Sequence, residues 1–358
     1  MRDRLRRLTL LLVALLLPLS LAELGLRSCA PLHLAGFQGG YVYDPELGYR
    51  IRPGQHYLVN TDHLQEIRTN ALGSVNFQES FAGYEQRVFA IGDSFTQGTG
   101  LSADSSYPFQ LDLFLNLRGG EYAPEYGVVN LGLAAYGLEQ ATLALRRYAE
   151  QIGRPDFVLY LACSNDAGDD ALFASGYRHG HLVDGSPSWG VWQRPLQLVV
   201  YQTEIGKRLK IALGALRRSW TSGTPVTAEQ DANPGARNAA APLEPGLERL
   251  LALTRSWDAE LIVGWTGWID ERGGSYEWLR AWAERNGVRF ADWHPRAASV
   301  VRAVPELPVS NPHSGGHHRP WVNRLIAETF GEQILAAAES RASCCPSAPG
   351  AADAGSAD

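Results

Sequence analysis

Arg87-Val88-Phe89-Ala90-Ile91-Gly92-Asp93-Ser94-Phe95-Thr96-Gln97-Gly98 joins a short apolar run to a serine that lies between two glycines. The apolar run predicts a buried strand, and Ser106 to Leu117 downstream predicts a helix. Gly92 and Gly98 permit tight turns on either side of Ser94. The stretch is therefore typical of a parallel strand whose carboxyl end presents a nucleophile at the edge of an α/β sheet.

The same strand pattern recurs along the chain. Further apolar runs predict strands at 128–131, 157–161, 261–265 and 288–291. Helical periodicity separates or follows them at 138–151, 245–256, 276–285 and 320–338. Continuous apolar strands that alternate with helices predict a parallel sheet covered on both faces, which is a three-layer α/β/α sandwich.

The length of 358 residues allows one large domain with appendages. We expect a β-rich lead-in at 28–86, where turn residues alternate with short apolar runs, and a main domain at 87–338. A flexible loop is expected inside the main domain at about 221–243, which is rich in Gly, Pro, Ala, Thr and Asn. The Ala-, Ser- and Gly-rich segment 339–358 predicts a disordered tail.

The first 27 residues are typical of an export signal. The apolar run Leu8–Ala22 follows four arginines, Arg2, Arg4, Arg6 and Arg7. Such a basic flank keeps the amino terminus in the cytoplasm and places the rest of the chain outside. Ser20-Leu21-Ala22 would allow cleavage and secretion, but we favour an uncleaved anchor that Glu23 to Leu26 lengthens. We expect a protein of the cell membrane whose main domain faces the periplasmic or extracytoplasmic side.

Composition argues against several other classes of function. The net charge is −6, and no basic block occurs beyond the first seven residues, which argues against a nucleic-acid partner. Glu23 and Arg27 interrupt the apolar lead-in to Cys29, which disfavours lipid attachment there. The four cysteines form no disulfide framework and have no metal-ligand spacing: Cys29, Cys163, Cys344 and Cys345. Neither a metal nor another cofactor is predicted.

Serine chemistry needs a nucleophile, a base that takes its proton, and donors that face the developing oxyanion. In an open parallel sheet these groups come from loops at the carboxyl ends of the strands. Ser94 follows the first predicted strand, Asn130 to Gly137 follows the second, and Ser164-Asn165-Asp166 follows the third. The segment 311–320, which holds three histidines, directly precedes the last predicted helix.

These segments resemble the four blocks of the SGNH (GDSL-type) hydrolase superfamily. The resemblance rests on Gly92-Asp93-Ser94-Phe95, Asn130-Leu131-Gly132, Asn165-Asp166, and His317 ahead of Asn323-Arg324-Leu325-Ile326-Ala327-Glu328. The anchor and the Asp44-Pro45-Glu46-Leu47-Gly48-Tyr49 segment are similar to bacterial exported or membrane-attached members. The resemblance covers about 8–165 and 310–335. It implies a flavodoxin-like sandwich and hydrolysis of carboxylic esters without a cofactor.

The resemblance also implies roles for single residues. Ser94 would be the nucleophile, and its own N–H would be the first oxyanion donor. The second donor in the family is a glycine N–H, and that position is Ala135 here. Asn165 matches the side-chain donor, whereas Gly132 matches a glycine that serves the turn.

The base is taken as His317, because its register to the last helix is the one that the family keeps. The rivals are His313, His318 and His294. Metal binding by His313 and His317, four residues apart, would need a helix, and Gly315-Gly316 argues against one.

The acid of the family lies two or three residues before the histidine, and those positions are Gly315 and Ser314. The expected aspartate is therefore absent. Asn311 or Asp292 could orient a histidine instead. A Ser-His dyad whose imidazole is oriented by a backbone carbonyl or amide also remains workable, at a lower rate.

The predicted function is a serine esterase that hydrolyses or transfers O-acyl groups, with an acetylated envelope or extracellular glycan as the first choice of substrate. Lipid or small esters are the next choice. Five tryptophans near the predicted site could stack on sugar rings, although core packing is their more common role: Trp189, Trp192, Trp265, Trp268 and Trp321. The alternative from another class is a non-catalytic binding or scaffold protein that kept the fold and lost the acid.

Overall fold

The computed structural model describes residues 2–29, 40–60, 64–118, 124–174, 203–221, 243–267, 274–311, 314 and 316–344. Its centre is a parallel sheet of five strands in the order β6-β5-β7-β8-β9. These strands are β5 (Gln86–Gly92), β6 (Tyr126–Asn130), β7 (Phe157–Ala162), β8 (Glu260–Trp265) and β9 (Arg289–Ala291). Numbered along the chain, this is the order 2-1-3-4-5 of flavodoxin-like folds. The predicted fold class is confirmed.

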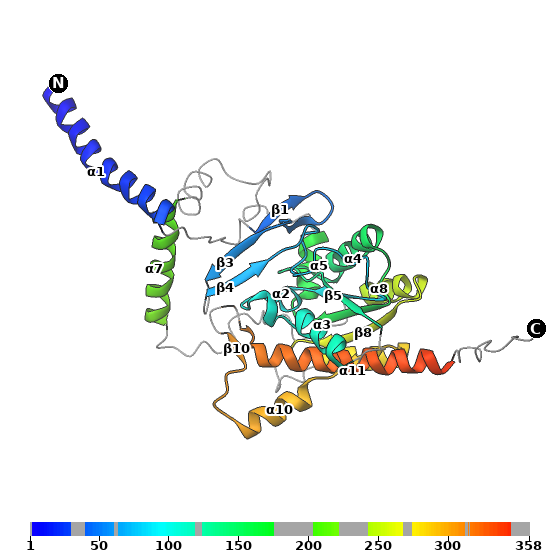
Figure 1. Ribbon diagram of the computed structural model, residues 1–358. Coiled ribbons are helices and arrows are strands. Elements are labelled where there is room, and N and C mark those ends of the chain that lie inside the picture. The colour runs from blue at the N-terminus through cyan, green and yellow to red at the C-terminus, as the bar shows by residue number, and fades with distance from the viewer. Residues whose placement is uncertain are drawn as a thin grey trace, which may run out of the picture.

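Helices cover both faces of the sheet (Figure 1). One face packs on α4 (Leu138–Ile152), α8 (Glu244–Ser256) and α9 (Gly274–Asn286). The other face packs on α3 (Tyr107–Arg118), α10 (His294–Ala303) and α11 (Pro320–Cys344). Because strand side chains alternate between faces, Phe89 and Ile91 enter the first core while Val88 and Ala90 enter the second. All four are fully buried, which is why the strands read as unbroken apolar runs.

The chain ahead of the sheet forms two antiparallel hairpins. They pair β1 (Tyr41–Asp44) with β2 (Gly48–Ile51) and β3 (His56–Asn60) with β4 (Leu64–Arg68). The β1–β2 hairpin shares a small core with the loop after β6 and with α4. Arg147 on α4 donates to Asp44 at 2.6 Å. The lead-in is thus packed against the loop at the end of β6.

The amino-terminal helix α1 (Arg2–Cys29) projects away from this body (Figure 1). Among the described residues, one helix is long and apolar enough to cross a membrane, and it is Thr9–Cys29 of α1. The end of α1 meets α7 (Glu204–Thr221), a helix outside the sandwich.

The predicted start of the tail differs from the structure, and the predicted flexible loop falls largely outside the described residues. Helix α11 continues to Cys344, so residues 339–344 belong to a helix and not to a disordered tail. The apolar face of α11 packs on the sheet as far as Ala337, and the last turns extend that helix without breaking it. The predicted flexible loop at 221–243 falls almost entirely on 222–242, which lie outside the described residues, as do 345–358.

Candidate active site

Ser94 is the first residue of the short helix α2 (Ser94–Gln97), directly after β5. Asp93 caps this helix, because its carboxylate accepts the N–H of Phe95 at 2.9 Å. Gly98 ends the helix in the left-handed region with a φ of 85°. Gly92 has a φ of 149°, and a Cβ there would lie 2.4 Å from Thr96 Oγ1. The two glycines thus let β5 turn sharply and leave the Ser94 side chain partly exposed.

A third short hairpin places His317 against this serine. Strands β10 (Ser310–Asn311) and β11 (His317–His318) pair antiparallel, with Asn311 opposite His317. His317 Nε2 lies 2.6 Å from Ser94 Oγ, and its ring packs 4.6 Å from the Phe95 ring. The structure therefore brings together the nucleophile and the base that the sequence ranked first.

The contact of the other ring nitrogen of His317 determines the tautomer of this ring. Nδ1 contacts the backbone carbonyl of Ser314. A carbonyl oxygen only accepts hydrogen bonds, so Nδ1 carries the proton and Nε2 is left to accept the proton of the serine hydroxyl. Ser314 occupies one of the two positions where the resemblance implies an aspartate. Its backbone carbonyl orients the imidazole in the tautomer of a general base.

Asn311, which the sequence offered as an orienting residue, supports the hairpin. Its amide nitrogen donates to the carbonyls of Gly100 and His318, at 3.3 Å and 3.4 Å. Gly100 has a φ of 83°, and a Cβ there would lie 2.7 Å from the Ser314 side chain. Asn311 therefore binds the hairpin to the loop after α2 and helps to set the position of Ser314.

The rival histidines lie elsewhere. His318 is buried between the rings of Phe95 and Trp293, and its Nε2 donates to the Thr266 carbonyl at 2.9 Å. Burial lowers the pKa of His318 to about 3, so its ring is neutral at physiological pH. It is a packed core histidine and not a base for Ser94. His313 lies outside the described residues.

His294 keeps the acid that His317 lacks, but it is enclosed. Its Nδ1 lies 3.0 Å from an Asp292 carboxylate oxygen, and its Nε2 lies 3.0 Å from the Gly267 carbonyl. Tyr276 donates its hydroxyl to the same carboxylate at 2.8 Å. The His294 ring stacks on Trp293, and its side chain is 1% exposed. Both ring nitrogens contact groups other than Ser94, which corrects the alternative that made His294 the base and Asp292 its partner.

The loop after β6 holds the predicted backbone donor in a strained conformation. Ala135 has a φ of 59°, in the left-handed region that favours glycine. Within the described residues, neither the Ser94 N–H nor the Ala135 N–H donates a hydrogen bond to another group. A first helical residue has no intrahelical acceptor for its N–H, which accounts for Ser94. Both donors are thus available to a ligand.

Hydrogen bonds from three directions fix this loop. Leu133 N–H donates to the Gly92 carbonyl at 3.1 Å, and Ala134 N–H donates to Gln97 Oε1 at 2.7 Å. The Tyr49 hydroxyl of the lead-in donates to the Ala134 carbonyl. Gln97 belongs to α2, so the loop is bonded to the strand and to the helix that flank Ser94. Sequence analysis missed Tyr49 and Gln97, whose contacts span distant parts of the chain.

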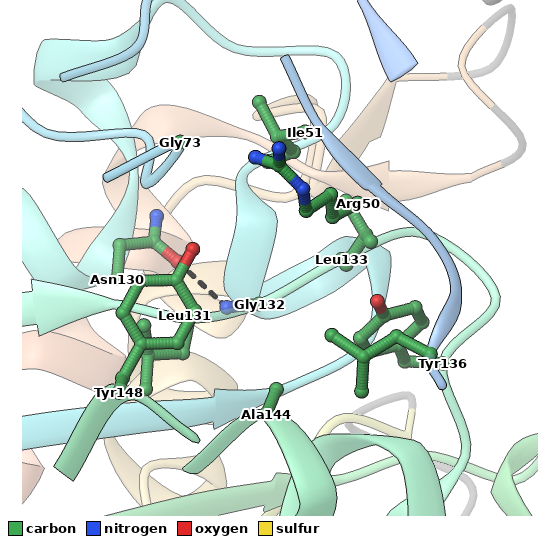
Figure 2. Close-up of a pocket in the computed structure, with 11 residues that line it drawn as sticks. Arg50, Ile51, Gly73, Asn130, Leu131, Gly132, Leu133, Tyr136, Ala144 and Tyr148 are labelled. Carbon is green, nitrogen blue, oxygen red and sulfur yellow. Dashed lines mark hydrogen bonds between the residues drawn. The ribbon is translucent and has the colours of Figure 1, made fainter. Parts of the chain in front are cut away.

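Gly132 has the structural role that the sequence predicted for it. A Cβ at this position would lie 2.3 Å from the Gln97 backbone nitrogen, so the loop approaches α2 more closely than a side chain allows. Asn130 Oδ1 accepts the Gly132 N–H at 3.0 Å, as Figure 2 shows. A small pocket lies behind the loop, lined by side chains of β2 and α4 that include Ile51, Ala144 and Tyr148. Its lining is largely apolar.

Asn165 follows β7, one residue before α5 (Asp166–Ala174), and it is exposed. Its amide nitrogen donates to Asp169 at 2.7 Å. The predicted oxyanion donor is therefore held by a neighbouring carboxylate. Burial raises the pKa of Asp169 to about 6, and the Asn165 hydrogen bond opposes that shift.

Two buried aspartates lie beneath the site. Asp166 accepts the Tyr160 hydroxyl and the Cys163 N–H, and burial raises its pKa well above the ordinary value. Burial likewise raises the pKa of Asp93 to about 6. Two like charges near each other in a buried space disfavour double ionisation of this pair. Sequence analysis did not predict this pair.

The sequence matches no family model and no curated protein. Solved structures with a similar course of the chain include that of TesA, with a TM-score of 0.41 and 12% identity over 70% of this chain and 98% of that one. The structure of a catalytic mutant of Axe2, an acetylxylan esterase from Geobacillus stearothermophilus, has a TM-score of 0.39 and 14% identity, and the match covers 70% of this chain and 95% of that one. The structure of a putative lipolytic protein of the G-D-S-L family from Desulfitobacterium hafniense DCB-2 has a TM-score of 0.38 and 13% identity, and the match covers 69% of this chain and 99% of that one. Likeness at this level assigns no function.

Proposed function

We propose that the chain is a serine esterase of the SGNH type. The observation that carries the proposal is the 2.6 Å contact between Ser94 Oγ and His317 Nε2, with the Ser314 carbonyl at the opposite ring nitrogen. A nucleophile that contacts a base, which a third group orients, is the arrangement that activates serine. The free N–H groups of Ser94 and Ala135 supply donors for an oxyanion.

In this proposal Ser94 Oγ attacks the ester carbonyl while His317 Nε2 takes the hydroxyl proton. The carbonyl oxygen becomes an oxyanion that the Ser94 and Ala135 N–H groups stabilise, and Asn165 joins them when its amide leaves Asp169. His317 then gives its proton to the departing alcohol, which leaves an acyl-Ser94. Water attacks the acyl group, His317 takes a proton from that water, and Ser94 regains its own as the carboxylic acid departs.

The absence of an aspartate before His317 defines the expected strength of this catalyst. A triad aspartate holds the imidazole in the correct tautomer and stabilises the imidazolium that forms. The Ser314 carbonyl can hold the tautomer, but as a neutral acceptor it stabilises the imidazolium less than a carboxylate does. We therefore expect a working dyad that is slower than a full triad.

For the substrate we propose an O-acyl ester, with acetyl groups on an envelope or extracellular glycan as the first choice. The apolar run of α1, with four arginines in the first turns of the helix, supports an envelope location with the main domain outside the cytoplasm. Of the five tryptophans considered for a sugar platform, two lie among the described residues. Trp265 is buried in the core, and Trp321 donates its Nε1 to the Pro308 carbonyl. Trp189, Trp192 and Trp268 lie outside the described residues.

A serine-reactive fluorophosphonate tests the proposed chemistry. We expect it to label the wild-type protein and to leave Ser94→Ala unlabelled, and we expect Ser94-dependent release of acetate from 4-nitrophenyl acetate. If the wild-type protein showed no labelling and no acetate release, the result would support the non-catalytic binding protein instead. Incubation with an acetylated oligosaccharide and a second, unacetylated sugar separates hydrolysis from acyl transfer, because only the latter moves the acetyl group to the acceptor.

A further inference from the structure

Helix α7 carries an exposed apolar stripe. Leu209, Leu213 and Leu216 recur at the i, i+4, i+7 spacing of one helix face. Their exposed fractions are 56%, 56% and 48%. Three large apolar side chains in a row on one exposed face mark a contact surface, whereas isolated exposed leucines do not.

The start of α7 is bonded to the end of the apolar helix α1. Glu23 of α1 accepts the backbone N–H groups of Glu204 and Ile205, at 2.9 Å and 3.0 Å. Arg27 pairs with the same carboxylate at 2.6 Å. Because charged side chains are costly within the hydrocarbon region, this pair marks the level at which α1 leaves the bilayer. The first turn of α7 therefore lies at the level of the membrane surface.

The charge of α7 fits an anionic surface. Its sequence holds one acidic residue, Glu204, against five basic ones: Lys207, Arg208, Lys210, Arg217 and Arg218. Lys207 and Arg208 contact Glu204 at 2.7 Å and 2.6 Å, so this acidic side chain is already paired. A basic helix with an apolar stripe and low overall hydrophobicity is the type that lies in the plane of the headgroups.

We propose that α7 is an interfacial helix that lies on the outer surface of the membrane, with Leu209, Leu213 and Leu216 immersed among the acyl chains and its basic residues at anionic phospholipid headgroups. Together with α1 it makes a two-point attachment, which restricts how the main domain tilts above the bilayer. The inference rests on anchoring by α1 and is independent of the esterase chemistry.

Fluorescence of the full-length protein in phosphatidylglycerol and phosphatidylcholine vesicles tests this placement. The background carries Cys29→Ser, Cys344→Ser and Cys345→Ser, and an environment-sensitive dye is attached at Leu213→Cys. The matched controls are Lys207→Cys on another face of α7 and Leu117→Cys, an exposed position on α3. Leu213 and Leu117 are 56% and 80% exposed, so folding is not expected to limit that comparison. The Lys207 side chain is 14% exposed beside Glu204, so Leu117→Cys is the primary control.

We expect the dye at Leu213→Cys to shift its emission to the blue and to be quenched by phospholipids that carry a nitroxide on the acyl chain. Quenching at least twofold stronger than at Lys207→Cys and Leu117→Cys would support an immersed stripe. Quenching at Leu213→Cys equal to that at Leu117→Cys would overturn the proposal. Equal strong quenching at Leu213→Cys and Lys207→Cys would also overturn it, because an interfacial helix immerses one face.

Discussion

His317 and His294 differ in the groups that contact their two ring nitrogens. His317 contacts Ser94 Oγ through one ring nitrogen and a backbone carbonyl through the other. His294 has a carboxylate behind it, but a backbone carbonyl occupies its other nitrogen and aromatic rings enclose it. An Asp-His pair in the sequence therefore does not identify a base. A ring nitrogen of His317 reaches Ser94, whereas both ring nitrogens of His294 contact other groups.

The two surroundings also show how a histidine ring can be oriented without a carboxylate. The hairpin β10–β11 positions the His317 ring, and Asn311 joins that hairpin to Gly100 through a hydrogen bond. The orienting function is thus supplied by backbone whose position the fold determines. At His294 the same kind of contact serves stability, because a buried polar group without partners is costly.

The largest expected effect is on the proposed dyad. Ser94→Ala and His317→Ala should each lower kcat/KM for 4-nitrophenyl acetate by about 10⁴-fold or more, because nucleophile and base act as a unit. The double variant should lose no more than either single one. Steady-state hydrolysis with purified proteins measures this. Additive losses in the double variant would contradict a shared step.

A smaller effect is expected from loosening the loop that holds Ala135. Tyr49→Phe removes the hydroxyl that donates to the Ala134 carbonyl and should lower kcat roughly tenfold with little change in KM, because the oxyanion contact forms in the transition state. Tyr148→Phe is the matched control, since it removes another tyrosine hydroxyl bond to the lead-in, at the Leu72 carbonyl. Equal kinetics in the two variants would show that the loop does not position a donor.

His294→Ala should change stability more than activity. Removing the buried ring leaves Asp292 and the Gly267 carbonyl without these contacts, so we expect the free energy of unfolding to fall by about 2 kcal/mol. Hydrolysis by the folded fraction should remain within about threefold of wild type. Urea unfolding and kinetics on the same preparation test both parts. A stable but inactive variant would move the base to His294.

The smallest effect concerns pH and the aspartate beside the nucleophile. The pKa of Asp93 is raised from 3.8 to about 6 by burial, so the folded state binds more protons than the unfolded state between these values. The free energy of unfolding should therefore fall as the pH rises through that interval, and Asp93→Asn should weaken this fall. Urea midpoints at about pH 4 and about pH 7 give the difference. An identical fall in both proteins would show that Asp93 does not contribute.

The sequence predicted the fold because its strands are buried on both faces and read as unbroken apolar runs, as at Val88 to Ile91. It also ranked Ser94 and His317 first, from glycine punctuation and from the register to the last helix. Their catalytic roles remain a proposal.

Other features of the site could not be predicted. The direction of the Asn165 amide depends on the rotamer and burial of Asp169. The bond between Tyr49 and Ala134 joins positions 85 residues apart, and local patterns do not encode such contacts. The choice between His317 and His294 depends on which ring reaches Ser94, and only the packed structure determines that.

The rate at which a fluorophosphonate modifies Ser94 in His317→Ala and in His294→Ala tests the central claim most directly. Intact-mass measurement over time gives the modified fraction without a choice of substrate. The account predicts that His294→Ala is modified at a rate close to that of wild type while His317→Ala is not measurably modified. Modification of His317→Ala at the wild-type rate, or its loss in a folded His294→Ala, would contradict it.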